Sequence, residues 1–116
     1  MKIIQPNHQI KLSELKPMAE KMFGSLIKGV VDVEKNILAL DAEMHVDEES
    51  ELLKQGSNQQ NLWGINLYPE LFRTPDFIEF DSMINIRPSV GNRTRGVEDK
   101  KIQDKIRRTV EKLVVE

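Results

Sequence analysis

Residues 38–47 carry the clearest pattern in the chain, an alternation of apolar side chains with more polar ones. Successive side chains of a strand point to opposite faces, so this pattern predicts an extended segment with an apolar face toward the core and an ionisable face away from it. The apolar set is Leu38, Leu40, Ala42, Met44 and Val46, and the other set is Ala39, Asp41, Glu43, His45 and Asp47.

This segment is predicted to pair with the one before it. Residues 27–33 are rich in β-branched side chains, and the polar residues 34–36 separate them from the run that begins at residue 37. Asn36 suits the positive φ angle of a tight hairpin turn. The connection therefore favours an antiparallel hairpin.

Three more strands and three helices are expected. The strands are Lys2–Ile4, residues 63–68 and a long one over residues 77–87. The helices cover residues 13–23, with Ser13 as N-cap and Pro17 in the first turn, residues 47–54, capped by Asp47, and residues 98–115. The buried stripe of the last helix is expected to be Ile102, Ile106, Thr109, Val110 and Leu113.

In chain order the elements read β-α-β-β-α-β-β-α, which predicts a single α+β domain over residues 1–116. Short connections favour one largely antiparallel sheet of four or five strands, with helices packed on one face. The other face is then polar and open unless a partner covers it. Because the sheet would have an uncovered face, we expect a homodimer.

Composition excludes several classes of site and location. The chain has no cysteine, which removes disulfides and thiolate metal sites. With only His8 and His45, a three-histidine zinc site is impossible. No apolar run approaches the roughly 20 residues that span a bilayer, and no signal-peptide core is present. We therefore expect a soluble, cytoplasmic protein without a membrane partner.

The net charge of −2 is unevenly distributed along the chain. Residues 1–86 carry a net −6 and residues 87–116 a net +4, and six carboxylates but no basic residue fall within residues 41–51. The basic part either neutralises the acidic part, within the chain or across a dimer, or binds an anion. Nucleic acid is not an expected partner, because a nucleic-acid binder is normally well above neutral.

The open sheet face is the first candidate site. Asp41 and Glu43 with Asp81 from another strand could hold a divalent ion that activates water for phosphoester hydrolysis, and His45, Glu43 and Asp81 are the candidate catalytic residues. The alternative is that these carboxylates only form ion pairs with basic neighbours. The face is expected to collect Lys28, Asp32, Asp41, Glu43, His45, Asn66, Tyr68, Glu79, Asp81, Asn85 and Arg87.

The loop of residues 91–96 is the second candidate site. It has the G-x-x-x-x-G half of a P-loop, but Val97 and Glu98 replace the required Lys and Ser/Thr, which excludes a nucleoside triphosphatase. A helix N-terminus with arginines nearby can still bind a phosphate or carboxylate, although Glu98 and Asp99 already complement its dipole. The candidate anion-binding residues are Arg87, Asn92, Arg93 and Arg95.

Four runs resemble a family of small bacterial and archaeal proteins described as uncharacterised. They are HVDEE at residues 45–49, NLWGINLYP at 61–69, FDSMINIRP at 80–88 and GNRTRGVED at 91–99. The resemblance covers nearly the whole chain and implies no activity, substrate or catalytic residue.

The leading hypothesis is a small binding or interaction protein without a cofactor. It would recognise an anionic group or an acidic protein partner through the polar sheet face and the loop of residues 87–96. A metal-assisted hydrolase and a purely structural or regulatory homodimer remain as alternatives, and the sequence does not decide between enzyme and binder.

Overall fold

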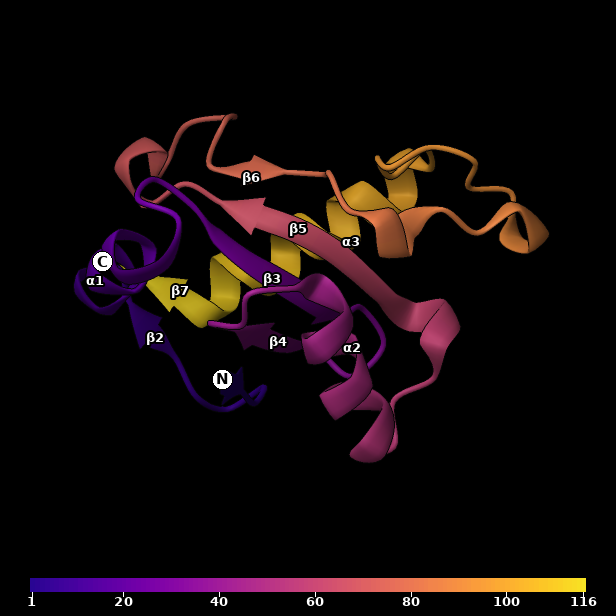
Figure 1. Cartoon of the computed structure of the whole chain (residues 1–116), viewed down its shortest axis with the longest axis horizontal. Helices are drawn as coiled ribbons and strands as arrows, with labels where there is room; N and C mark the ends of the chain where they lie inside the picture. The colour runs from indigo at the N-terminus through magenta and orange to yellow at the C-terminus, as the bar shows by residue number, and fades with distance from the viewer.

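The computed structural model describes residues 1–116 and is built around a five-stranded antiparallel sheet (Figure 1). The strand order is β1-β4-β3-β5-β6, and a separate parallel pair joins β2 to β7. The α+β class and the largely antiparallel sheet are therefore confirmed. The strands are β1 (Lys2–Ile4), β2 (Ile10–Lys11), β3 (Ile27–Asp32), β4 (Ile37–Leu40), β5 (Leu62–Leu67), β6 (Ile78–Glu79) and β7 (Val114–Val115).

Three α-helices and four short 3-10 turns complete the fold. The helices are α1 (Leu12–Met22), α2 (His45–Lys54) and α3 (Lys100–Leu113). The 3-10 turns are η1 (Gln59–Asn61), η2 (Pro69–Leu71), η3 (Met83–Asn85) and η4 (Pro88–Val90). The short strands β2 and β7 make the element order richer than the predicted one. No helix has the length and apolar character needed to cross a bilayer.

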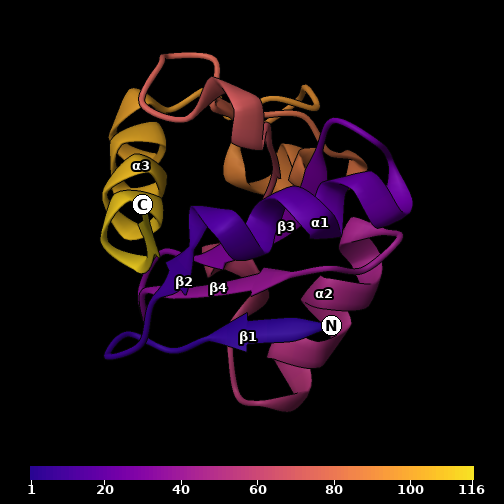
Figure 2. The same ribbon diagram turned by 90° about the vertical axis from the view of Figure 1, so that its left-hand side faces the viewer.

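The sheet is covered on both faces, which corrects the expectation of one open face. Helices α1 and α3 pack on one side over the main core of 17 buried residues. Helix α2 and η3 pack on the other side, where Leu52 joins a second cluster with strand residues such as Val30 and Leu62 (Figure 2). The cause lies in the strands themselves, because β4 reads Ile-Leu-Ala-Leu and is apolar toward both sides.

The predicted strand over residues 38–47 is wrong beyond Leu40. Strand β4 ends there, Asp41 takes a positive φ of 71°, and α2 begins at His45. The residues that α2 buries recur with helical spacing, and this period overrides the alternation seen in the preceding residues. The buried residues of α2 are His45, Glu48, Glu49 and Leu52.

The long strand predicted over residues 77–87 is also wrong, because β6 has only two residues and the chain turns into η3. The side-chain amide of Asn85 pairs with the β5 backbone in place of a longer β6. Its Oδ1 accepts a hydrogen bond from Gly64 N at 2.8 Å, and its Nδ2 donates to Gly64 O at 2.9 Å. Asn85 is fully buried, so this pairing satisfies the β5 backbone where β6 has left it.

Of the remaining local predictions, two are confirmed and one is wrong. The hairpin is confirmed, with Asn36 at a φ of 56°, and so is the buried stripe of α3, in which Ile102 is partly buried. The start of α1 is wrong: Lys11 is its N-cap, so Pro17 lies in the second turn. Glu14 explains the earlier start, because its Oε2 accepts a hydrogen bond from Lys11 N at 2.9 Å.

Gly64 tests the junction between β5 and η3. An added Cβ would overlap the Cβ and Oγ of Ser82, and relieving that overlap would displace Asn85. We expect Gly64→Ala to lower the free energy of unfolding by about 2–3 kcal/mol in urea denaturation. Gly96→Ala is the matched control, because its nearest non-neighbour atom is 3.5 Å from the new Cβ. Equal stability of the two variants would contradict the role assigned to this junction.

Candidate functional site

Polar residues gather at one end of the sheet face that carries α2. Lys28 of β3, Asn66 of β5 and Glu79 of β6 lie opposite one another in the strand register. Asn66 Nδ2 donates to Glu79 Oε1 at 2.9 Å, and Tyr68 donates to the same oxygen at 2.9 Å. The structure therefore brings together four residues of the predicted open face, although across a shorter stretch of sheet than expected.

His45 lies over this row from the first residue of α2. Its Nε2 is 2.8 Å from the carbonyl oxygen of Ile65, so Nε2 carries the proton and donates it. Burial lowers the pKa of His45, while the bond to Ile65 and the side chain of Asn66 act in the opposite direction. The ring is thus neutral at pH 7, with Nδ1 as a free acceptor.

Glu48 lies one turn further along α2 and is completely buried. Its Oε2 accepts a hydrogen bond from Ala42 N at 3.1 Å, and its Oε1 has no partner. Burial raises the pKa of Glu48 to about 9. The carboxyl is therefore protonated at pH 7 and adds no negative charge to the cluster.

Lys28 is the cation of this cluster, and it has no carboxylate partner. None of the four ion pairs of the chain includes it, and its Nζ lies 4.9 Å from the centre of the Phe23 ring. Its charge acts on both His45 and Glu48 and helps to lower the pKa of each. Because both of these groups are neutral at pH 7, they leave the charge of Lys28 unbalanced.

Two features border Lys28, namely the buried side chain of Asn66 and the uncapped start of α2. Asn66 is 6% exposed, and its Oδ1 has no hydrogen-bond partner within the chain. The first turn of α2 has Met44 at its N-cap, which provides no capping side chain. Asp47 N donates to Met44 O, and the N–H groups of His45 and Val46, which no side chain caps, carry the positive end of the helix dipole.

The N-terminus of α3 differs because carboxylates of the chain already occupy it. Asp99 Oδ1 accepts from Lys101 N at 2.9 Å, which caps the helix. Glu98 Oε2 accepts from Thr94 N at 3.1 Å and also from Arg93 N. The backbone donors that the sequence offered to an anion in this loop are thus bound to Glu98.

Two of the four predicted anion-binding residues form several hydrogen bonds within the chain. Asn92 is 4% exposed, and its amide donates to three backbone carbonyls between residues 85 and 96 while accepting from Glu98 N. Arg87 donates to the carbonyls of Gln59 and Leu62 and lies 4.3 Å above the Trp63 ring. Arg93 and Arg95 remain exposed, and Arg95 Nε lies 2.6 Å from Asp81 Oδ1.

The residues suggested for a metal do not come together. Asp41 and Glu43 precede α2 in a turn, and Asp81 follows β6 and pairs with Arg95. Nowhere in the chain do three His, Asp or Glu side chains lie close enough to hold one ion. The cause is the helix at residues 45–54, which removes the strand on which the metal hypothesis depended.

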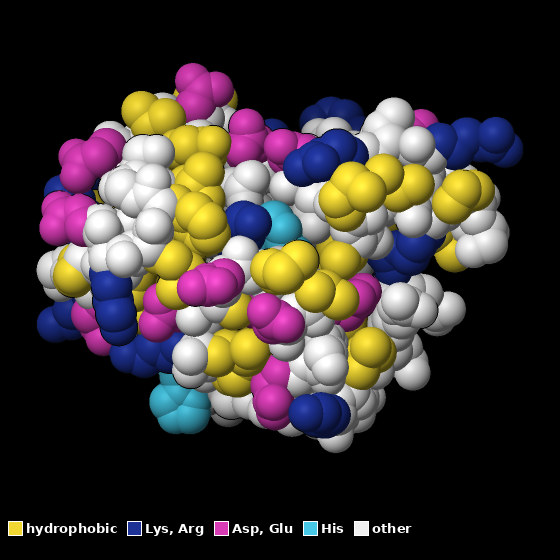
Figure 3. All heavy atoms as spheres, in the orientation of Figure 1, with side chains coloured by type: hydrophobic (Ala, Val, Ile, Leu, Met, Phe, Trp, Pro, Cys, Tyr) yellow, Lys and Arg dark blue, Asp and Glu magenta, His cyan; other side chains and the backbone are white.

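Sequence reasoning missed the buried acids of α2. Glu48 and Glu49 read as acids that complement the helix dipole, but both are buried, and Glu49 Oε2 has no partner. The spacing of His45, Glu48 and Leu52 is the signal that could have placed them inward. The acids on the outer side of α2 form no ion pair and remain at the surface (Figure 3).

The comparisons agree with the resemblance noted in the sequence. The model of the family described as "Protein of unknown function (DUF5674)" matches residues 2–113. The chain belongs to this family. In this DUF5674 protein, the four runs that carried the resemblance form the first turn of α2, strand β5, the segment after β6 and the loop before α3. No curated protein and no solved structure matches the chain.

The buried carboxyl of Glu48 makes stability depend on pH. The folded state keeps this proton up to about pH 9, whereas the unfolded chain loses it near 4.5, so the free energy of unfolding falls as pH rises through this interval. Glu48→Gln removes the titration, and we expect the variant to gain stability over the parent protein as pH rises from 7 to 9 in urea denaturation.

Glu51→Gln is the control for this experiment, because it makes the same change at a half-buried position of α2. It is expected to keep the pH dependence of the parent protein. A Glu48→Gln variant that loses stability with pH as steeply as the parent would show that another group is responsible. The interval from pH 7 to 9 avoids His45, whose lowered pKa makes its contribution to stability decline only at lower pH.

Proposed function

We propose that this DUF5674 protein binds a small anionic ligand at the N-terminus of α2. Lys28, His45 and Asn66 would contact the ligand, together with the free N–H groups of the first helical turn. The observation that carries the proposal is the uncapped start of α2, whose first residue is fixed over β5 beside a lysine without a carboxylate partner.

The charges at the site support an anion. At pH 7 Lys28 is positive, while burial keeps Glu48 protonated and His45 uncharged. Glu79 is the carboxylate of this row, and its Oε1 is already bound by Asn66 Nδ2 and the Tyr68 hydroxyl, while Asp81 is paired with Arg95. An anion at this position would gain from Lys28 and from the dipole of α2 without displacing an existing ion pair.

The orientation of the ligand follows from two acceptors. Asn66 Oδ1 and the bare Nδ1 of His45 both accept hydrogen bonds, so a ligand with a hydroxyl or N–H beside its anionic group satisfies the whole site. Arg93 and Arg95 are the exposed arginines of the loop, but Arg95 is paired with Asp81, so only Arg93 could contribute without breaking an ion pair. The hydrolase alternative gains no support from this geometry, because no metal-binding group is assembled.

Inorganic phosphate tests the proposal. We expect phosphate, compared with chloride at equal ionic strength and pH 7.5, to shift the NMR amide signals of His45 and Val46 and to raise the melting temperature. At a hundred times its Kd, phosphate would add about 2.7 kcal/mol to the free energy of unfolding. Lys28→Met is expected to weaken binding at least tenfold, because a charge-assisted hydrogen bond is lost.

Lys54→Met is the matched control, because it removes the same charge from the opposite end of α2. It should change the phosphate affinity by less than twofold. Melting curves without phosphate show whether Lys28→Met is folded. Equal affinity of the two variants, or phosphate shifts confined to residues outside α2, would contradict the site.

We also propose that the α2 side of the sheet is the surface of the expected homodimer. Six of the ten exposed large hydrophobic residues lie at α2 or between residues 83 and 90, where they form hydrophobic groups on one face (Figure 3). Asp47 of α2 and Arg93 are exposed and form no ion pair within the chain, so both are available to pair across a two-fold interface. The six are Met44, Val46, Leu53, Met83, Ile86 and Val90.

Sedimentation velocity over a wide range of protein concentrations tests the dimer. Met83 is 65% exposed, so Met83→Asp should leave the fold intact and weaken self-association at least tenfold. Met22→Asp, on α1 and 36% exposed, is the control and should have little effect. A parent protein that remains a monomer at all concentrations would disprove the dimer.

A further inference from the structure

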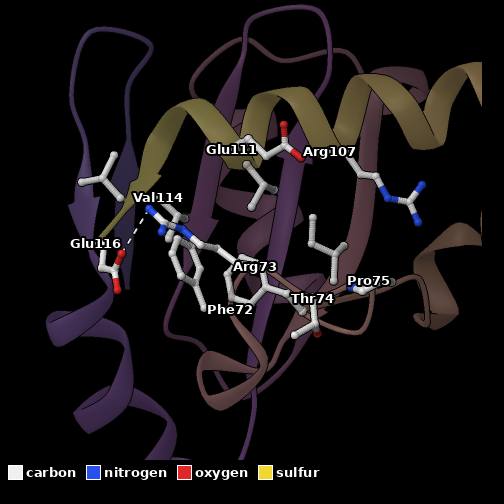
Figure 4. Close-up of a pocket in the computed structure, with 12 residues that line it drawn as sticks. Phe72, Arg73, Thr74, Pro75, Arg107, Glu111, Val114 and Glu116 are labelled. Atoms are coloured by element: carbon white, nitrogen blue, oxygen red, sulfur yellow. Dashed lines mark ion pairs between the residues drawn. The ribbon is translucent and has the colours of Figure 1, made fainter.

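A cavity of about 620 Å³ lies between α3 and the chain around β6 (Figure 4). It belongs to the side of the sheet that α3 covers, whereas α2 packs on the other side. Phe72 and Phe77 form one wall, with their rings edge to face at 5.1 Å. Val110 of α3 and Val114 of β7 line it on the side of α3 and form a second wall. Its volume is in the range of cavities that bind small ligands or side chains of a partner.

The free edge of the sheet borders this cavity. Strand β6 pairs only with β5, and Tyr68 N donates to Phe77 O at 2.9 Å. Opposed residues of an antiparallel pair alternate between bonded and non-bonded positions, so Ile78, opposite Leu67, directs its own N–H and C=O away from β5. Ile78 also lines the cavity. One backbone donor and one acceptor are therefore available beside an apolar hollow.

Two arginines stand at the ends of the cavity. Arg73 Nη2 lies 3.1 Å from Glu116 Oε1, in an exposed pair that crosses one end (Figure 4). Arg107 lies at the other end, 4.9 Å from the centre of the Phe80 ring, and has no carboxylate partner. An acidic group at this end would find a cation that the chain itself does not neutralise.

We propose that an extended peptide segment of a partner protein adds to the free edge of β6 and fills this cavity. Its backbone pairs with the N–H and C=O of Ile78, and alternate side chains of the segment, which are apolar, enter between the two walls. An acidic residue or a terminal carboxylate of the segment pairs with Arg107. A free apolar small molecule would use the walls but not the edge of β6, which is why a peptide is the preferred occupant.

Panning of phage-displayed random heptapeptides on the full chain tests this proposal. Enriched peptides are expected to alternate apolar residues and to carry an acidic group. A fluorescein-labelled enriched peptide is then titrated by fluorescence polarisation. Arg107→Glu should weaken it at least tenfold, whereas Arg108→Glu, an exposed neighbour on α3 outside the cavity, should change the affinity less than twofold.

A second measurement examines the backbone pairing directly. At saturation, hydrogen exchange of the Ile78 amide should slow at least tenfold, and N-methylation of the peptide residue opposite Ile78 should abolish that protection. The proposal is overturned if no peptide is enriched over the bare support, if the two arginine variants bind equally, or if Ile78 stays unprotected. Protection of Ile78 by increasing concentrations of the protein alone would replace the peptide with a second copy of the chain.

Discussion

The pairing of the Asn85 side chain with the backbone of Gly64 is the interaction on which the rest of the polar region depends. It completes the hydrogen bonds of β5 with a side-chain amide, so the chain can leave the sheet after Glu79 without abandoning buried donors and acceptors. Only glycine fits at position 64, because Ser82 fills the space of a Cβ. The early end of β6 leaves Asn66 at the border between the strand and the segment that follows, where Asp81 O also approaches its amide.

Much of the fold follows from local sequence, and the two wrongly predicted strand segments fail for one physical reason. The hairpin at Asn36, the alternation of Trp63 and Ile65 and the stripe of α3 depend on short-range periodicity, and these predictions are confirmed. Residues 41–47 and 80–87 fail because their alternation has no partner strand to satisfy it. In the structure, helix α2 with its buried acids and the buried amide of Asn85 replace the predicted strands. Both depend on contacts between residues distant in sequence, such as Asn85 with Gly64.

The same error explains why the candidate site in the structure differs from the predicted one. The sequence correctly indicated that Lys28, Asn66, Tyr68 and Glu79 share a face, because each belongs to a real strand or its immediate extension. It placed His45 on that face for the wrong reason, since the ring arrives from a helix above the sheet. The helical spacing could have placed Glu48 inward, but its raised pKa depends on how completely the packed fold buries the carboxyl.

The two helix N-termini near the sheet differ in whether their backbone donors are already bound, and this difference favours the proposed anion site at α2 over the arginine-rich loop. The loop before α3 is rich in arginine, yet Glu98 and Asp99 already accept hydrogen bonds from its backbone N–H groups. An incoming anion would have to displace one of these carboxylates. The carboxylate is part of the chain and loses no translational entropy when it binds, whereas a free anion does. The start of α2 has one lysine nearby and no capping side chain, and of its acids Glu48 is protonated, Asp47 is exposed and Glu49 is buried. The proposed site at α2 therefore has less cationic charge than the loop before α3, but an anion there would not have to displace a carboxylate of the chain.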